Sequence, residues 1–464
     1  MSYQSPFSIR YGSSEMRSLW SETAKRRTWR RVWVSVAEAQ TAAGLITAEQ
    51  LDDLRSQTEN IDIQRAREIE AEIGHDLVAE LRTFAEQCPT GGGVLHWGLT
   101  SADVQDNADV VRQKAALVII LDRLRTALLA LADRIDDTHD LTVLGYTHLQ
   151  PAEPTTLGYR LAGYAQDLLS HFEGLLRLHQ QLRGKGIRGA VGTAGPFVDM
   201  LADNDVTPEM LEATVMKALD LDAHLITTQV YPRSQDYAVV CALAGLAASL
   251  HKFAFDVRLM QSPGFPTLHE PFGYDQVGSS AMPFKRNPVA VEKVCSLARE
   301  VSAWTQVAWG NAANSLLERT LDDSANRRTM LPEVFLACDE MMLALNPVIE
   351  GFIIDKREAD LQLAQHGAFI ALERVLTLAV QEGGDRQELH ESLRQHSMTA
   401  LDALMEGRPN PLIDLVAQEP LLLKYLQPAR IKELLDSTTY TGLASQRALE
   451  MAVNIRSRFG TARA

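Results

Sequence analysis

Long runs of apolar residues at helical spacing are the feature that most constrains the fold of this chain. Between Leu117 and Ile135, leucine and isoleucine recur in steps of three and four residues, at positions 117, 121, 124, 128, 131 and 135. Such a seam is typical of a helix that packs against other helices. Alternating, strand-like runs bounded by tight turns are almost absent. The sequence therefore predicts a nearly all-α protein.

Five stretches between about Asp103 and Phe352 are long enough for extended helices, and polar or proline-containing loops separate them. The second stretch follows Thr155 and Thr156, either of which can cap a helix. Long helices joined in this way predict an elongated bundle. A mixed helical region precedes it, and shorter helices with breaks at "EGGDRQ" and "GRPNP" follow it. We therefore expect three domains, at residues 1–101, 102–354 and 355–464.

Composition narrows the classes of function. The 464 residues include 45 basic and 60 acidic side chains, which give a formal net charge of −15. This charge argues against a nonspecific binder of nucleic acid or of anionic membranes, and favours a small-molecule partner. The basic run "AKRRTWRRVW" fits an amphipathic helix, with Trp29 and Trp33 four residues apart, better than a nucleic-acid patch.

The N-terminal residues, the apolar runs and the cysteines predict where the protein is located and whether its thiols are free. The first residues lack the basic-then-apolar pattern of a signal peptide, and the apolar runs are too short and interrupted to span a bilayer, so we expect a cytosolic protein that does not enter a membrane. Its four cysteines are isolated from one another. We expect buried free thiols rather than disulfides or a zinc site.

Polar clusters stand where the long helices start or stop. One such cluster alone would usually be a helix cap, but five in one chain point to a binding site. Helix N-termini favour anions, so these positions suit carboxylate or phosphate groups. The clusters contain His75 and Asp76; His96, Thr100, Ser101 and Asn107; His148 and Gln150; Gln229 and Arg233; and Ser279, Ser280, Lys285 and Asn287.

The segment "GSSAMPFKRNP" resembles the signature G-S-S-x-M-P-x-K-x-N-P of the fumarase/aspartase superfamily. Within that superfamily, "HWGLTSADVQDN", "GYTHLQPAEPTTLGYR", "TTQVYPRSQD" and "RTLDDSANRR" resemble segments of the adenylosuccinate lyases, in the same order and at the same spacing. The resemblance implies a three-domain all-α fold with a central long-helix bundle. It also implies a homotetramer with a twenty-helix core, in which three subunits build each active site.

The resemblance implies a β-elimination that releases fumarate from adenylosuccinate to give AMP, and from the succinylaminoimidazole carboxamide ribotide of purine synthesis. A base must take a proton from a carbon next to a carboxylate while an acid protonates the leaving nitrogen. Ser279 matches the base of the family and His148 its general acid, and His75 matches a second histidine near the phosphate and succinyl groups. Lys285, with Asn287 and loop amides, can stabilise the developing charge. This chemistry needs no metal and no other cofactor.

Nucleotide recognition is expected from further positions that match the family pattern. Arginine suits this task because its planar fork fits phosphate and carboxylate groups. Three positions depart from the pattern, namely Gly74, Phe284 and Lys293, and they bear on the phosphate-side contacts. The expected substrate-binding residues are Arg10, Tyr11, Asp76, Thr100, Ser101, Gln229, Asn287, Lys293, Arg319, Ser324 and Arg328.

Two other functions remain open. A sister lyase or cycloisomerase of the superfamily would share the signature loop and His148, but should lack the "ERTLDDSANRR" segment. A noncatalytic structural homologue, like the lens crystallins related to argininosuccinate lyase, is disfavoured because Ser279 and His148 are both intact.

The apolar surfaces of the long helices also predict assembly. The seam from Leu117 to Ile135 and the small residues from Ala242 to Ala248 are expected to leave too much apolar surface for a monomer. A homotetramer would cover both.

Overall fold

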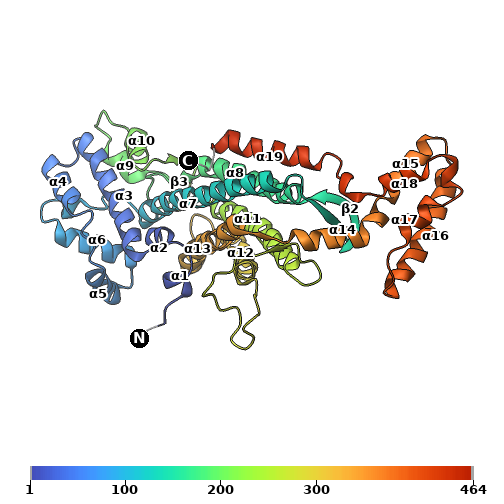
Figure 1. Ribbon diagram of the computed structural model, residues 1–464. Helices are drawn as coiled ribbons and strands as arrows, with labels where there is room; N and C mark the ends of the chain where they lie inside the picture. The colour runs from blue at the N-terminus through green and yellow to red at the C-terminus, as the bar shows by residue number, and fades with distance from the viewer. Residues whose placement is uncertain (1–2, 461–464) are drawn as a thin grey trace. The chain divides into compact units, whose positions relative to one another are not determined.

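The computed structural model describes residues 3–460, most of which are helical (Figure 1). The all-α prediction is confirmed. The elements before the first long helix are α1 (Pro6–Ile9), α2 (Ser14–Leu19), α3 (Glu22–Ala42), α4 (Ala48–Ser56), α5 (Ile63–Ile73), α6 (Asp76–Gln87) and the 3₁₀ turn η1 (Gly92–Val94).

Five helices of 25 to 38 residues lie where the apolar periodicity predicts them. They are α7 (Ser101–Thr138), α8 (Leu157–Gln181), α11 (Ser234–Met260), α12 (Val289–Ala313) and α13 (Asp322–Gly351). Thr156 provides the cap of α8, because its Oγ1 accepts a hydrogen bond from the N–H of Tyr159 at 3.1 Å. Helix α13 begins at Asp322, so much of "ERTLDDSANRR" is helical.

Shorter helices fill the remaining parts of the chain. Two of them, α9 (Gly195–Met200) and α10 (Pro208–Ala218), lie between α8 and α11. The breaks predicted at "EGGDRQ" and "GRPNP" are confirmed, since they separate α15 from α16 and α16 from α17. The C-terminal elements are α14 (Lys356–Ile370), α15 (Leu372–Gln381), α16 (Arg386–Met405), α17 (Leu412–Ala417), η2 (Leu422–Lys424), α18 (Pro428–Leu434), η3 (Ser437–Thr439) and α19 (Ala444–Phe459).

A β-hairpin is the main departure from the all-helical expectation. Strands β1 (Thr142–Thr147) and β2 (Gln150–Thr156) pair antiparallel before α8, where the sequence predicts a loop. Two further sheets have strands of two residues each. They are the parallel pair β3 (Arg183–Gly184) and β4 (Asp222–Ala223), and the antiparallel pair β5 (Leu268–His269) and β6 (Ile353–Ile354).

Tertiary contacts divide the chain into two compact units. The first unit comprises residues 1–124, 170–251 and 293–344, and the second comprises residues 125–169, 252–292 and 345–464. All five long helices pass from one unit into the other. The division into domains at residues 1–101, 102–354 and 355–464 stays a prediction.

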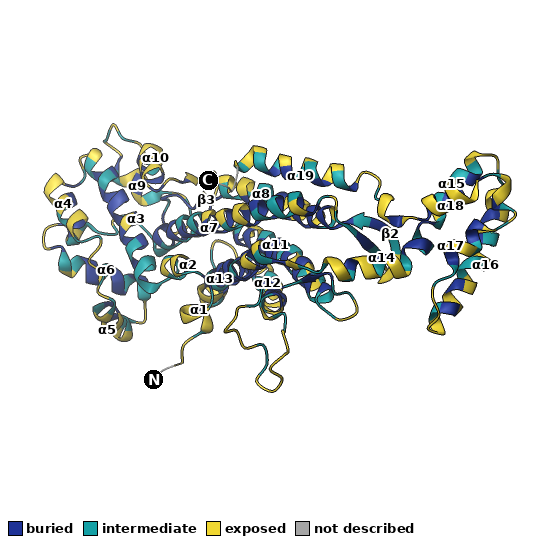
Figure 2. Cartoon of the chain, in the orientation of Figure 1, coloured by how far each residue is buried: buried dark blue, intermediate teal, exposed yellow. Residues whose placement is uncertain are grey.

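The leucine seam of α7 is buried within a single chain. Leu117, Leu124, Leu128 and Leu131 have no exposed surface, and the expectation that this seam awaits a partner subunit is therefore wrong. Figure 2 shows α13 buried along much of its length, whereas the loop that precedes α12 is mostly exposed. Helical period alone shows that an apolar face exists, and the structure shows that other parts of the same chain cover it.

The basic run in α3 is neutralised inside the first unit. Arg26 and Arg30 are buried, and both donate to the carboxylate of Glu80, at 3.0 and 2.6 Å. Trp29 and Trp33 are also buried, as expected for one apolar face of the helix. The arginines of this run are therefore partly structural, which agrees with the preference for an amphipathic helix over a nucleic-acid patch.

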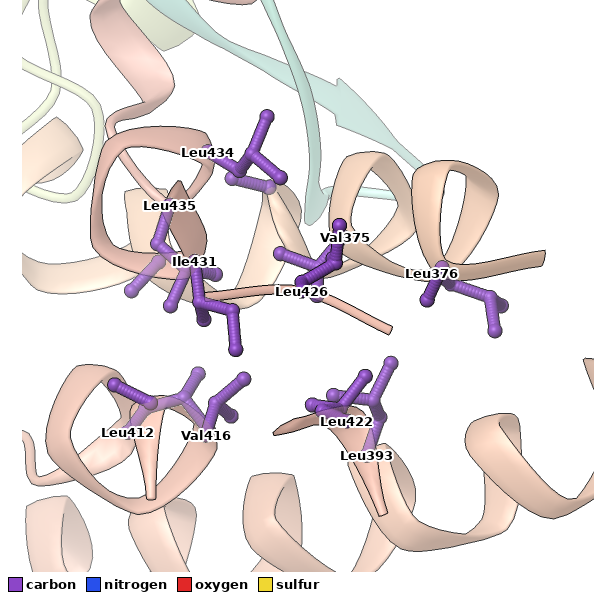
Figure 3. Close-up of a cluster of buried hydrophobic side chains, with 14 of the residues drawn as sticks. Val375, Leu376, Leu393, Leu412, Val416, Leu422, Leu426, Ile431, Leu434 and Leu435 are labelled. Atoms are coloured by element: carbon purple, nitrogen blue, oxygen red, sulfur yellow. The ribbon is translucent and has the colours of Figure 1, made fainter. Parts of the chain in front are cut away.

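The C-terminal helices of the second unit have a core of their own. Val375 of α15, Leu393 of α16, Val416 of α17 and Ile431 of α18 point toward one another in a cluster of buried aliphatic side chains (Figure 3). Their burial removes apolar surface from water at roughly 25 cal/mol per Å². This core holds α16 together with α15, α17 and α18, which have 10, 6 and 7 residues and are too short to be stable alone.

Two helical stretches, Ser234–Met260 and Lys356–Gln381, have the length and apolar content of a membrane span, so the expectation that the apolar runs are too short and interrupted is wrong. Core helices of water-soluble proteins have the same properties. Leu243, Leu246 and Leu250 of α11 are fully buried against protein, which is the environment of a core helix. All four cysteines are free, as expected, and Cys88, Cys295 and Cys338 are buried. Cys241 is only partly buried, so the expectation of burial is wrong for that residue.

Candidate functional site

The N-termini of three helices, α6, α7 and α13, lie at one cavity of about 400 Å³ in the first unit. Each N-terminus supplies backbone N–H groups without helical partners and the positive end of a helix dipole, so the cavity favours anions. The predicted site residues that line it are His75, Asp76, Thr100, Ser101, Gln229, Arg319, Ser324 and Arg328.

Helix α6 places His75 and Asp76 at the cavity. His75 is the N-cap residue, its Nδ1 accepts the N–H of Val78 at 3.4 Å, and its side chain is 47% exposed. The preceding residue, Gly74, ends α5 with a φ of +67°, a backbone conformation that L side chains rarely adopt. Gly74 therefore has a structural reason to depart from the family pattern, because it allows the chain to turn sharply between two helices.

Helix α7 begins beside Thr100 and Ser101, and a buried aspartate fixes this start. The N–H of Thr100 donates to Asp103 Oδ2 at 2.8 Å, and Asp103 also accepts the backbone N–H groups of Arg188 and Gly189, at 3.0 and 3.1 Å. The ammonium group of Lys185 is its buried ion-pair partner. The Thr-x-x-Asp spacing is a capping-box pattern, so Asp103 carries a local sequence signal even though it is not among the predicted site residues.

Helix α13 contributes the cationic side of the cavity. Arg319 lies just before it, Ser324 is in its first turn, and Arg328 follows one turn later. Arg328 Nη2 forms an ion pair with Asp76 Oδ2 at 2.8 Å, and the side chain of Arg328 remains 51% exposed. The structure thus brings the "ERTLDDSANRR" segment and the start of α6 to the same cavity.

A buried ionic network lies behind these cations. The guanidinium of Arg233 donates to both carboxylate oxygens of Asp106, at 2.9 and 3.1 Å, and to Asp323 at 2.6 Å. Arg327 donates to Asp236 at 2.8 Å and to the hydroxyl of Tyr231 at 2.7 Å. Sequence reasoning named Arg233 and missed the other members, because helical periodicity does not show which charged residues are buried and paired.

A second cavity of about 310 Å³ adjoins the first, since Asp76, Arg319, Ser324 and Arg328 line both. Its other walls include Trp20 and Trp29. Ala102 and Gln105 also line both cavities, so six residues stand between the two spaces.

His96 is partly buried and precedes Thr100 by four residues. It has a φ of +65°, and its Nδ1 accepts the indole N–H of Trp33 at 3.0 Å. Burial lowers the pKa of His96 to about 4, with a smaller contribution from His75, so its imidazole is neutral at physiological pH. The neutral ring acts as a hydrogen-bond acceptor for Trp33.

Three predicted binding residues of the first unit do not line either cavity. Arg10 and Tyr11 follow α1, where the N–H of Gly12 donates to Glu340 at 2.9 Å. Lys293 Nζ forms an ion pair with the same glutamate at 2.5 Å. The side chain of Glu340 thus joins the segment after Arg10 and Tyr11 to Lys293.

The signature loop belongs to the second unit and carries Ser279, Lys285 and Asn287. Ser279 Oγ accepts two backbone N–H groups, from Ala281 at 3.3 Å and from Met282 at 3.1 Å. Asn287 Nδ2 donates to the carbonyl of Gly278 at 2.8 Å and closes the base of the loop, whereas Lys285 is exposed. These contacts supply two backbone hydrogen-bond donors to the Ser279 oxygen.

His148 lies at the tip of the β1–β2 hairpin in the second unit. Thr147 pairs with Gln150, so His148 and Leu149 form a two-residue turn, and both have positive φ, of 54° and 58°. Type I′ turns require this conformation and normally contain asparagine and glycine. Strained residues of this kind cluster at functional sites. Between residues 3 and 460, no hydrogen bond or ion pair joins His148 to Ser279.

Metal-ligating side chains do not gather in the described part of the chain. Across residues 3–460, no group of three or more histidine, cysteine, aspartate or glutamate side chains is placed to hold a metal ion. The groups that converge on the candidate site are hydrogen-bond donors, arginines and helix N-termini.

Known proteins similar to this chain identify its family. Residues 11–303 match a family model described as lyase, and residues 368–448 match one described as the adenylosuccinate lyase C-terminus. An adenylosuccinate lyase from Schistosoma mansoni is 38% identical over 417 residues, which cover 89% of this chain and 86% of the relative. The chain belongs to the adenylosuccinate lyase family. The adenylosuccinate lyase from Saccharomyces cerevisiae is 35% identical, over 96% of this chain and 92% of the relative. The one from Pyrococcus abyssi is 35% identical, over 97% of this chain and 97% of the relative.

Solved structures support the fold of this adenylosuccinate lyase family member. A 3-carboxy-cis,cis-muconate lactonizing enzyme from Pseudomonas putida matches with a TM-score of 0.86 at 23% identity, over 98% of this chain and 99% of that one. A fumarate lyase from Mesorhizobium matches with a TM-score of 0.84 at 21% identity, over 98% and 100%. The predicted superfamily fold and the predicted lyase class are confirmed, and the roles of individual residues stay predictions.

Proposed function

We propose that this chain releases fumarate from adenylosuccinate to give AMP, and from the succinylaminoimidazole carboxamide ribotide to give the aminoimidazole carboxamide ribotide, in purine nucleotide biosynthesis. Family membership supports the reaction. The observation that carries the substrate class is the cavity where three helix N-termini, Arg319 and Arg328 lie together, since both substrates carry a phosphate and carboxylates.

Proton removal is assigned to Ser279. In the elimination, Ser279 Oγ acts as an alkoxide: it takes a proton from the carbon next to a carboxylate and becomes a hydroxyl, while the C–H electron pair forms the new double bond as the C–N bond breaks. Donors from the Ala281 and Met282 backbone support this role, because hydrogen bonds to a charged oxygen favour its ionised form. Lys285 and Asn287 are assigned to the substrate carboxylate on which the negative charge develops.

Proton delivery is assigned to His148. The departing nitrogen takes the C–N electron pair and needs a proton, and imidazole can donate one near neutral pH. The hairpin supports this role because a turn held by two positive-φ residues presents the ring beyond the ends of both strands.

Substrate binding is assigned to the cavity of the first unit. Arg319, Ser324 and Arg328 would hold the phosphate, and His75, Thr100, Ser101 and Gln229 would contact the remainder of the ligand. Asp76 pairs with Arg328, so a bound anion competes with Asp76 for that guanidinium. Arg10, Tyr11 and Lys293 complete the proposed binding set.

A homotetramer in the cytosol is the proposed state, and three subunits would contribute to each active site. The support is the apolar surface around proposed functional residues. Phe284 and Met282 of the signature loop are 83% and 44% exposed, and Leu317 and Leu321, close to Arg319, are 91% and 71% exposed. Covering such side chains by other subunits removes apolar surface from water.

The direct test is to add adenylosuccinate to the purified protein and to follow the ultraviolet absorbance. We expect AMP and fumarate in equal amounts, and a parallel reaction with the carboxamide ribotide substrate. A protein that leaves both compounds unchanged, yet eliminates fumarate from another succinyl-amine, would be a sister lyase. The lining of the cavity by "ERTLDDSANRR" residues supports the adenylosuccinate assignment over that alternative.

A further inference from the structure

Arg319 lies on the loop before α13, and its guanidinium binds the carboxylate of Asp323 in that helix. Arg319 Nη1 donates to Asp323 Oδ1 at 2.7 Å, and the arginine side chain is 24% exposed. Arg319 lines both cavities. Among the residues that the structure describes, Asp323 is its sole acidic partner. The orientation of this guanidinium therefore depends on one buried side chain.

Asp323 is itself fixed by the network behind the cavity. Its side chain is 3% exposed, and its second oxygen, Oδ2, accepts Arg233 Nε at 2.6 Å. Arg233 in turn donates to both oxygens of Asp106. One oxygen of Asp323 thus faces the scaffold and the other faces the cavity arginine. Burial raises the pKa of Asp323, but the charges of Arg233 and Arg319 lower it by more, so the net pKa is below its ordinary value. The carboxylate is therefore ionised at neutral pH.

We propose that Asp323 is a positioning residue for substrate binding, which orients the Arg319 guanidinium toward the cavity before the anionic ligand arrives. The proposal rests on the proposed function, in which Arg319 binds the substrate. A free arginine side chain loses rotamer entropy when it becomes ordered on a ligand. Because Asp323 already orders Arg319 in the free protein, ligand binding does not lose this rotamer entropy.

This role predicts a separation between KM and kcat. Asp323 touches neither of the residues assigned to proton transfer, so its loss should weaken binding and leave the chemical step unchanged. In Asp323→Asn, one face of the side chain becomes an amide N–H₂ group that cannot accept from a guanidinium. We expect KM to rise about tenfold, as for a lost charge-assisted hydrogen bond, with kcat within about twofold.

A matched control separates positioning from simple loss of stability. Asp236 is also buried, and it accepts from Arg327 at 2.8 Å and from the Tyr231 hydroxyl at 2.5 Å, but it lines neither cavity and does not contact Arg319. Asp236→Asn should lower the Tm and keep the wild-type KM. If Asp323→Asn and Asp236→Asn lower the Tm alike and both leave KM unchanged, Asp323 is structural only and the proposal is overturned.

Arg319→Ala distinguishes failure of this proposal from failure of the proposed function. If Arg319→Ala leaves KM unchanged, Arg319 does not bind substrate and the assigned binding role is wrong. If Arg319→Ala raises KM but Asp323→Asn does not, the positioning proposal alone fails. When both raise KM, the double variant should show little more than Arg319→Ala alone, because the two substitutions remove one interaction. Additive effects in the double variant would overturn the coupling.

A second variant keeps the proposal testable if Asp323→Asn does not fold. Arg319 is on a loop and partly exposed, so Arg319→Lys should not disturb the core. Lysine keeps the charge but lacks the planar fork that serves Asp323 and a ligand together. We expect KM to rise nearly as much as in Arg319→Ala, and a wild-type KM for Arg319→Lys would overturn the proposal.

Discussion

The guanidinium of Arg328 and the carboxylate of Asp76 form an ion pair at 2.8 Å, which joins the start of α13 to the start of α6. Asp76 is 10% exposed and Arg328 is 51% exposed, so the arginine is the member that can turn toward a ligand. In the proposed function, a phosphate or carboxylate oxygen takes the place of Asp76 beside this guanidinium.

Arg328→Ala is expected to weaken substrate binding far more than turnover. Charge-assisted hydrogen bonds contribute about 1.5–3 kcal/mol, so KM should rise about tenfold to a hundredfold. Steady-state kinetics with adenylosuccinate measures both constants. Arg394, which is 54% exposed and pairs with Glu391 in the second unit, is a matched control, and Arg394→Ala should keep the wild-type KM. An unchanged KM in Arg328→Ala would remove this arginine from the binding set.

Ser279→Ala should abolish turnover and preserve binding. Loss of a general base costs typically 10²–10⁴-fold in rate, whereas the cations and helix N-termini that hold the substrate are untouched. Calorimetric titration with adenylosuccinate would show the retained binding. Ser280→Ala, on the same loop, is the control and should remain active. A Ser279→Ala protein with near-normal kcat would exclude Ser279 as the base.

His148→Gln should also bind substrate without turning it over. Glutamine can donate a hydrogen bond to the leaving nitrogen but cannot deliver a proton, so the fall in kcat should resemble that of Ser279→Ala. Gln150→Ala, beyond the same turn, should leave kcat largely intact. Retention of kcat in His148→Gln would mean that another group protonates the nitrogen.

Mixing the Ser279→Ala and His148→Gln proteins should restore activity. In the proposed tetramer the two residues of one active site come from different subunits, so subunit exchange rebuilds some sites with both residues intact. Each variant taken through the same dissociation and reassociation alone is the control. Inactive mixed tetramers, with exchange verified by mass spectrometry, would refute the shared site.

Activity should survive exhaustive treatment with EDTA, because the proposed proton transfers use serine and histidine and the proposed charge stabilisation uses lysine, asparagine and backbone amides. The rate before and after chelation measures this. Loss of activity that a divalent ion restores, with the Tm unchanged, would require a different mechanism.

Acid should destabilise the fold partly through His96. Its pKa of about 4 lies below the ordinary value of 6.5, so the unfolded chain takes up this proton first as the pH falls. The contribution of His96 to stability is full above pH 6.5 and is lost between pH 6.5 and 4. In His96→Asn, which tolerates the positive φ and does not titrate, the Tm should fall less steeply over this range. If the Tm of the wild type and of His96→Asn falls equally steeply with pH over this range, His96 does not contribute to the acid destabilisation.

The long helices and the polar helix starts could be predicted because they depend on local periodicity and capping. The β1–β2 hairpin could not, since Pro151 and Pro154 interrupt β2 and its residues do not alternate between apolar and polar. Nor could the partners of Arg233 and Arg327 be predicted, because helical period does not reveal which aspartates face them from other helices. The seam of α7 was identified correctly, but its covering surface depends on tertiary packing.

The hairpin tip has a consequence for efforts to make this protein more heat-resistant. A left-handed backbone costs most L residues about 1–2 kcal/mol each, and both His148 and Leu149 adopt positive φ. A selection for thermal resistance alone would therefore favour asparagine and glycine at these two positions, and would discard the imidazole assigned to protonate the leaving group. A mutant library selected for thermal resistance should therefore keep His148 unchanged and vary other positions.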